Sequence, residues 1–175
     1  MPESFAEYVR RIEGEVEGRD RLRVLLSTPA ALARKIRRIS RRRLVRSPAK
    51  GKWSVGEILA HLADTELLWA FRIRKILEEK NPVLQGMDQD QWAVRLQYRR
   101  FDPAESLELF RALRTRNLAI LRPLPPGELR RTGLHTQFGK LSIDRIITLM
   151  SGHDLNHSRQ IGKILAKRPA ASIEA

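Results

Sequence analysis

Helix-start signals followed by apolar residues at helical spacing constrain the fold of this chain more than any other sequence feature. Ser54-Val-Gly-Glu57 is a capping box, in which a serine and a glutamate satisfy free N–H groups at a helix start. Trp53 and Ile58 flank this box as a hydrophobic staple. Apolar residues then recur with helical periodicity, which predicts one long helix to about Glu79, before Asn81-Pro82.

Two further long helices are predicted in the second half of the chain. Asp102-Pro103-Ala-Glu105 combines a cap, a proline in the first turn and an N3 glutamate, and the prolines from Pro123 onward end that helix. Ser142 caps a final helix that runs to about Lys167. We expect a long loop between these helices, and it carries His135.

The first half of the chain contains weaker helix signals. Thr28-Pro29 is interpreted as an N-cap and a first helical residue, which predicts a helix through about Ile39. Ser4-Phe-Ala-Glu7 is another capping box, and residues 88–98 are expected to form a short connecting helix. Four main helices with short additional helices predict an all-α four-helix bundle.

The length and composition predict one helical domain over residues 1–168, followed by a disordered tail at 169–175. The chain has no cysteine, which excludes disulfides, cysteine-ligated zinc and a cysteine nucleophile. No apolar run approaches the roughly 20 residues that span a bilayer, and the N-terminus lacks a secretory signal. We therefore expect a cytoplasmic protein with no membrane partner.

Basic residues are concentrated in one segment. The net charge is +14, and residues 34–52 hold ten Lys or Arg and no Asp or Glu. One interpretation is a patch that binds phosphates or another anionic surface, with nucleic acid as a partner. The interpretation that we favour is a solvated helix end and loop, since the segment has little aromatic interleaving for stacking on bases.

His153 and His157 lie four residues apart in the predicted final helix, so their side chains share one helix face. On a helical wheel they fall inside the apolar stripe of Ile146, Met150 and Ile161, which points them into the bundle. Two buried imidazoles without partners would cost roughly 1–3 kcal/mol each, and a shared cation would satisfy one nitrogen of each. Hydrogen-bonded core histidines are the alternative. A zincin protease is excluded, because H-E-x-x-H is absent.

His61 could supply a third ligand from another helix, because it lies at the edge of that helix's apolar stripe. Three histidines would leave coordination positions open for water or substrate, which favours a catalytic over a closed structural site. Metal-bound histidines usually donate their second N–H to a nearby acceptor, and Glu57, Asp64 and Asp154 are candidates.

A family resemblance strengthens this interpretation. Trp53-Ser-Val-Gly-Glu-Ile-Leu-Ala-His61-Leu-Ala-Asp-Thr-Glu66 resembles the first signature of the DinB-like (YfiT-like) superfamily. His135-Thr-Gln-Phe-Gly139 and Ser151-Gly-His153-Asp-Leu-Asn-His157 together resemble the second, and the match covers roughly residues 20–165. The resemblance implies a four-helix bundle, often a homodimer, with a divalent metal held by three histidines. The metal ligands that it implies are His61, His153 and His157.

The leading functional hypothesis is a metal-dependent enzyme that acts on a small-molecule substrate. Some relatives use the metal to activate a low-molecular-weight thiol for S-transfer or isomerisation, and here the thiol would have to be a cosubstrate, because the chain has no cysteine. Imidazole ligands favour zinc or nickel, with manganese or iron as further options. The alternatives are a metal-dependent hydrolase, or a non-catalytic protein that binds polyanions or nucleic acid through residues 34–52.

Three other residues near the predicted site are given structural roles. Trp69 and Arg72 follow His61 by two to three helical turns and could line a cleft, but we expect Trp69 to pack in the core and Arg72 to face solvent. His135 is expected to be a surface or loop-packing histidine.

Overall fold

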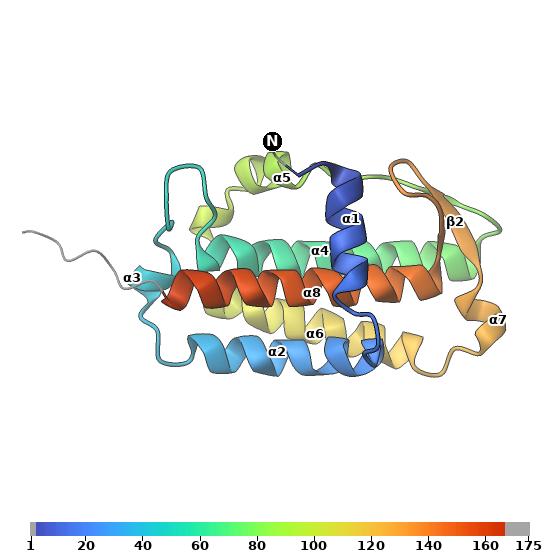
Figure 1. Cartoon of the computed structure of the whole chain (residues 1–175), viewed down its shortest axis with the longest axis horizontal. Helices are drawn as coiled ribbons and strands as arrows, with labels where there is room; N and C mark the ends of the chain where they lie inside the picture. Colours follow the sequence, from blue (N-terminus) through green and yellow to red (C-terminus); the bar gives the residue numbers. More distant parts are fainter. Residues whose placement is uncertain (1–2, 167–175) are drawn as a thin grey trace, which may run out of the picture.

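A computed structural model describes residues 3–166 and shows four long helices packed side by side (Figure 1). The long helices are α2 (Arg21–Ile36), α4 (Val55–Glu78), α6 (Pro103–Leu121) and α8 (Ile143–Ala166). The shorter elements are α1 (Phe5–Gly14), α3 (Arg41–Leu44), β1 (Val83–Leu84), α5 (Gln89–Arg95), the 3₁₀ helix η1 (Tyr98–Arg100), α7 (Pro126–Leu129), β2 (Thr132–His135) and β3 (Gly139–Ser142). The predicted all-α four-helix bundle is confirmed, and the expected tail at 169–175 lies outside the described residues.

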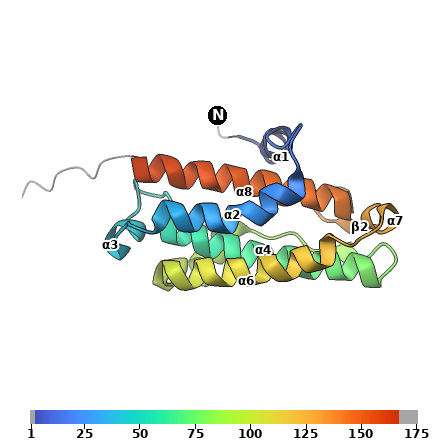
Figure 2. The ribbon, with the colours of Figure 1, turned by 90° about the horizontal axis from the view of Figure 1, so that it is seen from below.

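The four long helices form a closed ring in which α2 and α4 each pack against both α6 and α8 (Figure 2). The colour gradient in Figure 1 shows that α4 and α6 run in the same direction, opposite to α2 and α8. Parallel neighbours need a connection that returns along the bundle, and residues 79–102 provide it. This connection contains α5, which contacts α4 (Figure 1).

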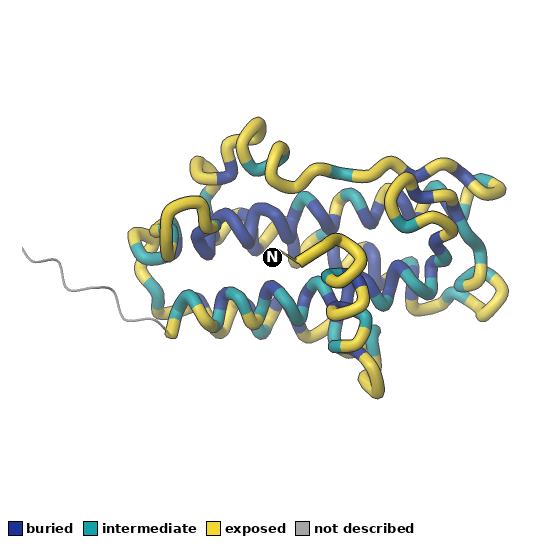
Figure 3. Tube along the Cα trace, turned by 45° about the horizontal axis from the view of Figure 1, so that its top comes forward, coloured by how far each residue is buried: buried dark blue, intermediate teal, exposed yellow. Residues whose placement is uncertain are grey.

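Burial follows the inward faces of the helices, while their outer faces and most connections are exposed (Figure 3). Ile58, Leu62 and Ile73 of α4 have almost no solvent-accessible surface, as the helical spacing of the apolar residues predicts. Within the described residues, no helix is both long enough and apolar enough to span a membrane.

The helix α1 crosses α8 steeply rather than joining the ring (Figure 1). The crossing is at Gly152, where a Cβ atom would lie only 2.1 Å from the carbonyl oxygen of Ile12. Only glycine permits two helix backbones to approach so closely. Gly152 therefore allows α1 to pack across the helix that carries two of the candidate ligands.

The predicted caps account for the starts of four helices. Ser4 and Ser54 form complete capping boxes with Glu7 and Glu57. The Asp102 carboxylate accepts hydrogen bonds from two backbone amides at the start of α6. The Ser142 hydroxyl accepts a hydrogen bond from the Arg145 amide at the start of α8. The short helix predicted at 88–98 is present as α5.

The predicted start of the second helix at Thr28-Pro29 is wrong. Asp20 caps α2 instead, and Pro29 lies inside the helix, which ends at Ile36 rather than Ile39. A proline removes the N–H that would bond to the carbonyl four residues earlier, here that of Leu25. The Arg114 guanidinium donates a 2.9 Å hydrogen bond to this carbonyl oxygen, so a tertiary contact replaces the missing helix bond.

The long loop predicted before the final helix is also wrong in part, because it contains a β-hairpin. Strands β2 and β3 pair antiparallel, and β1 pairs parallel with β2 to give the order β1-β2-β3. The turn ends at Gly139, whose φ of +66° favours glycine. Each strand has at most four residues, so their sequence periodicity is too short to recognise.

Candidate metal centre

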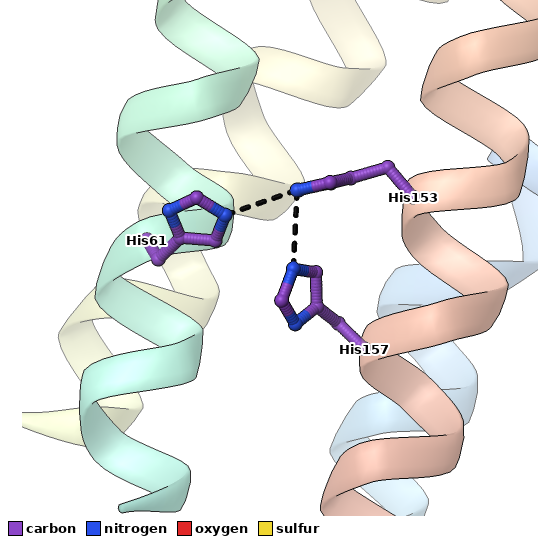
Figure 4. A group of neighbouring side chains, drawn as sticks. All are labelled: His61, His153 and His157. Atoms are coloured by element: carbon purple, nitrogen blue, oxygen red, sulfur yellow. Dashed lines mark hydrogen bonds between the residues drawn. The ribbon is translucent and has the colours of Figure 1, made fainter. Parts of the chain in front are cut away.

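Three histidine side chains meet between α4 and α8 (Figure 4). The Nε2 atom of His153 lies 3.0 Å from Nε2 of His61 and 3.1 Å from Nε2 of His157. One ligand nitrogen from each side chain lies within 4.8 Å of the others. Ligand nitrogens of a tetrahedral zinc ion, each bonded at about 2.0–2.1 Å, are roughly 3.3 Å apart. The three predicted ligands are therefore brought to spacings close to those that a single ion requires.

Hydrogen bonds among the three rings cannot satisfy all of these nitrogens. The Nδ1 atom of His157 lies 2.8 Å from the amide oxygen of Gln160, to which it donates, so the neutral His157 ring has only a lone pair at Nε2. One proton on Nε2 of His153 would have to serve both His157 and His61. A cation accepts a lone pair from each ring at once, so the donor set fits a divalent metal better than it fits a hydrogen-bonded core.

Burial keeps the three histidines in the neutral form that binds metals. His61 is 1% exposed and His157 is 6% exposed, while His153 is partly buried. Desolvation, followed by the charge of His157, lowers the pKa of His61 well below its usual value of 6.5. Desolvation also lowers the pKa of His153 well below 6.5 and that of His157 to about 4. The lone pairs are therefore available at neutral pH.

The local sequence explains how the ligands are positioned. The capping box begins α4 nearly two turns before His61, and the Trp53 ring packs against the His61 imidazole with ring centroids 4.9 Å apart. His153 and His157 project from successive turns of α8. The convergence across the bundle follows from the direct packing of α4 against α8.

The carboxylates predicted to orient the histidines have other roles. Glu57 caps α4 and pairs with Arg99, while Asp154 pairs with Arg114. Asp64 has no hydrogen bond to any of the three rings within residues 3–166. The observed partners are Gln160 for His157 and, at 3.4 Å, Thr65 for Nδ1 of His61. Gln160 follows His157 by three residues, which is the sequence signal for this contact.

A buried ionic cluster lies directly behind the histidines. The Arg114 guanidinium donates to Asp154 at 2.6 and 3.0 Å and to Glu66 at 2.8 Å. Asn117 donates to the same Glu66 carboxylate at 2.7 Å. The sequence patterns did not predict this cluster, although Arg114 and Asn117 lie at helical spacing on the face of α6 that carries Phe110, Leu118 and Leu121, which is a usable signal.

The three histidines border a cavity of about 790 Å³. Its walls come from α1, α4 and α8, from the segment before and at the start of α5, and from the hairpin turn. The lining residues include Phe5, Tyr8, Arg11, Trp53, His61, Leu68, Trp69, Arg72, Met87, Asp88, Phe138, Leu149, His153, Asn156 and His157. This volume suits a small organic substrate that can approach the open side of the histidine cluster.

Arg72 differs from its predicted environment, whereas His135 has the loop-packing role that was one of the two expected for it. Arg72 was expected to face solvent, but it is 4% exposed, borders the cavity and donates to the carbonyl oxygen of Gln85 at 2.5 Å. Trp69 is buried, as predicted, and also borders the cavity. His135 is buried in β2 rather than on the surface, and its Nδ1 accepts hydrogen bonds from the amides of Gln137 and Phe138. The burial of Arg72 and His135 depends on the 79–102 connection and on the hairpin. Helical periodicity predicts neither of these segments.

The basic segment lies at one end of the bundle and is mostly solvated. It covers the end of α2, α3 and the loop before α4 (Figure 1). Within residues 3–166, the side chains of eight of its ten basic residues form no ion pair or hydrogen bond with another segment. Arg41 pairs with Asp102, and Arg43 donates to the carbonyl oxygen of Leu165. Lys52, at the end of the segment, borders the cavity.

The model of the DinB superfamily matches residues 24–161, which include all three clustered histidines. The chain belongs to the DinB superfamily. A solved structure of YfiT from Bacillus subtilis covers 82% of this chain and 83% of its own, with 25% identity and a TM-score of 0.77. That protein is described as a probable metal-dependent hydrolase with an unusual four-helix bundle topology.

Curated relatives have the same kind of name. A protein of Oceanobacillus iheyensis is 30% identical over 141 residues, which is 80% of this chain and 81% of the relative. YfiT itself is 26% identical over 162 residues, and the match covers 91% of both chains. Both carry the name “putative metal-dependent hydrolase”. The resemblance recognised from the sequence motifs is thereby confirmed at the level of the family.

Proposed function

We propose that this DinB-superfamily protein is a divalent-metal-dependent hydrolase with His61, His153 and His157 as its metal ligands. The observation that carries the proposal is the convergence of three neutral imidazoles, from two helices, beside a cavity of about 790 Å³. Three ligands leave at least one coordination position for water or substrate. The names of the relatives support hydrolysis as the reaction class.

The residues around the proposed ion would have separate roles. His61, His153 and His157 would hold the ion, and Gln160 would fix the His157 tautomer by accepting its Nδ1–H. When bound, a divalent ion supplies Lewis acidity that polarises a substrate carbonyl and lowers the pKa of water or a thiol. The indole of Trp53 shields one face of His61 from solvent. The three-imidazole donor set favours zinc or nickel over manganese and iron.

Thiol transfer is a second candidate, and one observation favours it. Within residues 3–166, the carboxylates that border the cavity are Glu3, Asp88 and Asp90, and all three are exposed, so none of them is buried beside the histidines as a general base. A thiol cosubstrate needs no such base, because a metal-coordinated thiol is deprotonated outright. The expected small-molecule substrate, homodimer and cytoplasmic location remain predictions.

The proposal is tested by metal analysis and activity together. Protein purified without chelator is expected to contain about one zinc or nickel ion per chain, and His153→Ala is expected to lose it. His135→Gln is the matched control, because that histidine does not belong to the cluster. A panel of nitrophenyl esters and anilides is then assayed without thiol, and 1-chloro-2,4-dinitrobenzene is assayed with cysteine or dithiothreitol.

The two reaction classes give different results in these assays. Metal-dependent ester or amide cleavage without thiol supports the hydrolase, and conjugation that requires both thiol and metal supports the second candidate. Equal metal content in the wild type and His153→Ala would overturn the assignment of the ligands. A metal-loaded wild type that turns over neither class of substrate would contradict an enzymatic role on these substrates.

A further inference from the structure

Among the residues that the structure describes, three cationic side chains border the cavity, and they differ in whether their charge is already compensated. Arg11 pairs with the carboxylates of Glu3 and Glu15. Lys52 is exposed to water, which solvates its charge. Arg72 is 4% exposed, and no carboxylate within residues 3–166 forms an ion pair with it. Arg72 is therefore the buried positive charge of this cavity, and such a charge is costly without an anion.

Several hydrogen-bond donors at and around Arg72 lack an acceptor. The Arg72 guanidinium lies over the Trp69 ring, 4.7 Å from its centroid, and donates from Nη2 to the Gln85 carbonyl. Its Nε atom is buried without a hydrogen-bond partner, and the indole Nε1 of Trp69 is in the same state. Buried donors without partners are rare in folded proteins, so each calls for an explanation.

His135 adds a third donor to this group. Its Nδ1 accepts two backbone hydrogen bonds, so the proton of the neutral ring is on Nε2, which is buried without a partner. His135 pairs with Leu84 across β1 and β2, and Arg72 donates to the carbonyl of the next residue, Gln85, so the two side chains are near each other. Desolvation first, and then the Arg72 charge, lower the pKa of His135 to about 4. Arg72, Trp69 and His135 therefore bring three buried N–H donors without acceptors into one neighbourhood.

The position of Arg72 along α4 sets its distance from the metal ligands. His61 and Arg72 are separated by eleven residues, or about 16 Å of helical rise. Side chains in a helix lean toward its N-terminus, so the Arg72 head group lies on the His61 side of its own Cα atom. Both residues border the same cavity, so one elongated small molecule can contact both.

We propose that Arg72, with the Trp69 indole N–H, binds a carboxylate group of the substrate, several bonds away from the bond that reacts at the three-histidine centre. This inference rests on the proposed function, because it places the anionic end of the substrate of that same site. A single carboxylate matches the single uncompensated charge of Arg72 and the fork of its guanidinium. A phosphate dianion fits less well, because the exposed carboxylates of Asp88 and Asp90, which form no ion pair within residues 3–166, add negative charge around the cavity.

The direct test is a titration with benzoate, compared with phenyl phosphate and with the neutral benzyl alcohol. Proton–nitrogen NMR spectra of the zinc-loaded wild type follow the Arg72 Nε–H and the Trp69 Nε1–H. We expect benzoate to shift both resonances, with tighter binding than either comparison compound. The titration is repeated after EDTA treatment, and the Arg72-dependent binding is expected to persist, which separates it from coordination to the metal.

Variants test whether the guanidinium is the cause. Arg72→Gln is expected to weaken benzoate binding by roughly tenfold or more, because a charge-assisted hydrogen bond is lost. Lys52→Gln, which removes an exposed cavity cation, is expected to change the affinity by less than about threefold. Arg72→Lys keeps the charge but not the fork, and is expected to fall between the wild type and Arg72→Gln. The wild-type NMR titration remains decisive if Arg72→Gln does not fold.

Several results would overturn the inference. These are an unmoved Arg72 Nε–H resonance, equal benzoate affinity in Arg72→Gln, tighter binding of phenyl phosphate or benzyl alcohol, or benzoate binding that disappears with the metal. None of these readouts depends on turnover. A protein that binds benzoate through Arg72 but contains no metal would contradict the proposed function alone. If the protein is a metal-dependent hydrolase but Arg72→Gln binds benzoate as tightly as the wild type, only the carboxylate subsite is contradicted.

Discussion

The buried Arg114 side chain forms hydrogen bonds to three other helices. It is 2% exposed, and it joins Asp154 of α8, Glu66 of α4 and the Leu25 carbonyl of α2 to its own helix α6. One guanidinium therefore contacts all of the other long helices. Because Asp154 is next to His153, and Glu66 is five residues from His61, these contacts also set how α4 and α8 present their ligands.

Replacing Arg114 tests this role. Arg114→Met leaves Asp154 and Glu66 as buried carboxylates without a cation, and it frees the Leu25 carbonyl again. We expect the free energy of unfolding in urea to fall by about 3–5 kcal/mol. Arg116→Met, on the exposed side of the same helix, is the control and should change it by less than about 0.5 kcal/mol. A loss below about 1 kcal/mol in Arg114→Met would show that the cluster does not hold the helices together.

His135 predicts a pH dependence of stability. Its pKa in the folded protein is lowered to about 4, first by desolvation and then by Arg72, whereas in the unfolded chain it is near 6.5. Between these values the unfolded chain binds a proton that the folded protein does not, so stability is lost as the pH falls from 6.5 toward 4. Between pH 6.5 and 4, the free energy of unfolding in urea should fall by about 1–3 kcal/mol less in His135→Gln than in the wild type. Parallel stability curves for the two proteins would contradict this prediction.

At the scale of the elements, close backbone contacts decide where the short helices lie. The helix α1 forms one wall of the cavity, and it can do so because Gly152 lets it cross α8 directly. The other wall comes from the 79–102 connection, which the parallel arrangement of α4 and α6 requires. The four-helix ring supplies the ligands, and these two additions enclose the space beside them.

Two glycines of α8 provide a matched pair of substitutions. In Gly152→Ala the new methyl group would lie 2.1 Å from a backbone oxygen of α1, so α1 must move away. We expect a loss of about 2 kcal/mol or more in the free energy of unfolding, together with faster proteolysis near α1. In Gly162→Ala the nearest atom is the flexible end of Lys35 at 3.4 Å, so helix propensity should raise stability by about 0.5–1 kcal/mol. Similar effects of the two substitutions would show that α1 is not held at Gly152.

At the scale of the whole molecule, the proposed metal centre would link α4 to α8, which are distant in sequence. An ion that binds only the folded protein raises the free energy of unfolding by RT ln(1 + L/Kd), where L is the free ion concentration, so the gain grows with the logarithm of that concentration. Free zinc at about a hundred times its Kd should therefore raise the free energy of unfolding by about 2.7 kcal/mol.

This prediction can be checked by thermal unfolding with zinc and with EDTA. The midpoint should rise with zinc and return with EDTA in the wild type and in His135→Gln, which keeps the cluster intact. His153→Ala should show no such shift. An equal zinc-dependent shift in His153→Ala would place zinc binding elsewhere in the molecule.

The sequence alone determined the features that depend on local interactions. Caps at Ser54, Asp102 and Ser142 predict the starts of three long helices, because each cap acts within three residues of itself. The apolar spacing predicts which faces turn inward, and this includes the inward direction of His153 and His157. The family motifs then added His61 to the same group.

Only the tertiary structure decided the features that depend on residues distant in the chain. Pro29 lies inside α2 because Arg114, 85 positions later, bonds to the carbonyl that the proline leaves free. Arg72 is buried because the 79–88 segment and the hairpin cover a helix position that periodicity alone leaves open. Helical periodicity reports how a residue faces its own helix axis, whereas burial and ion pairing depend on which other segments pack against that face.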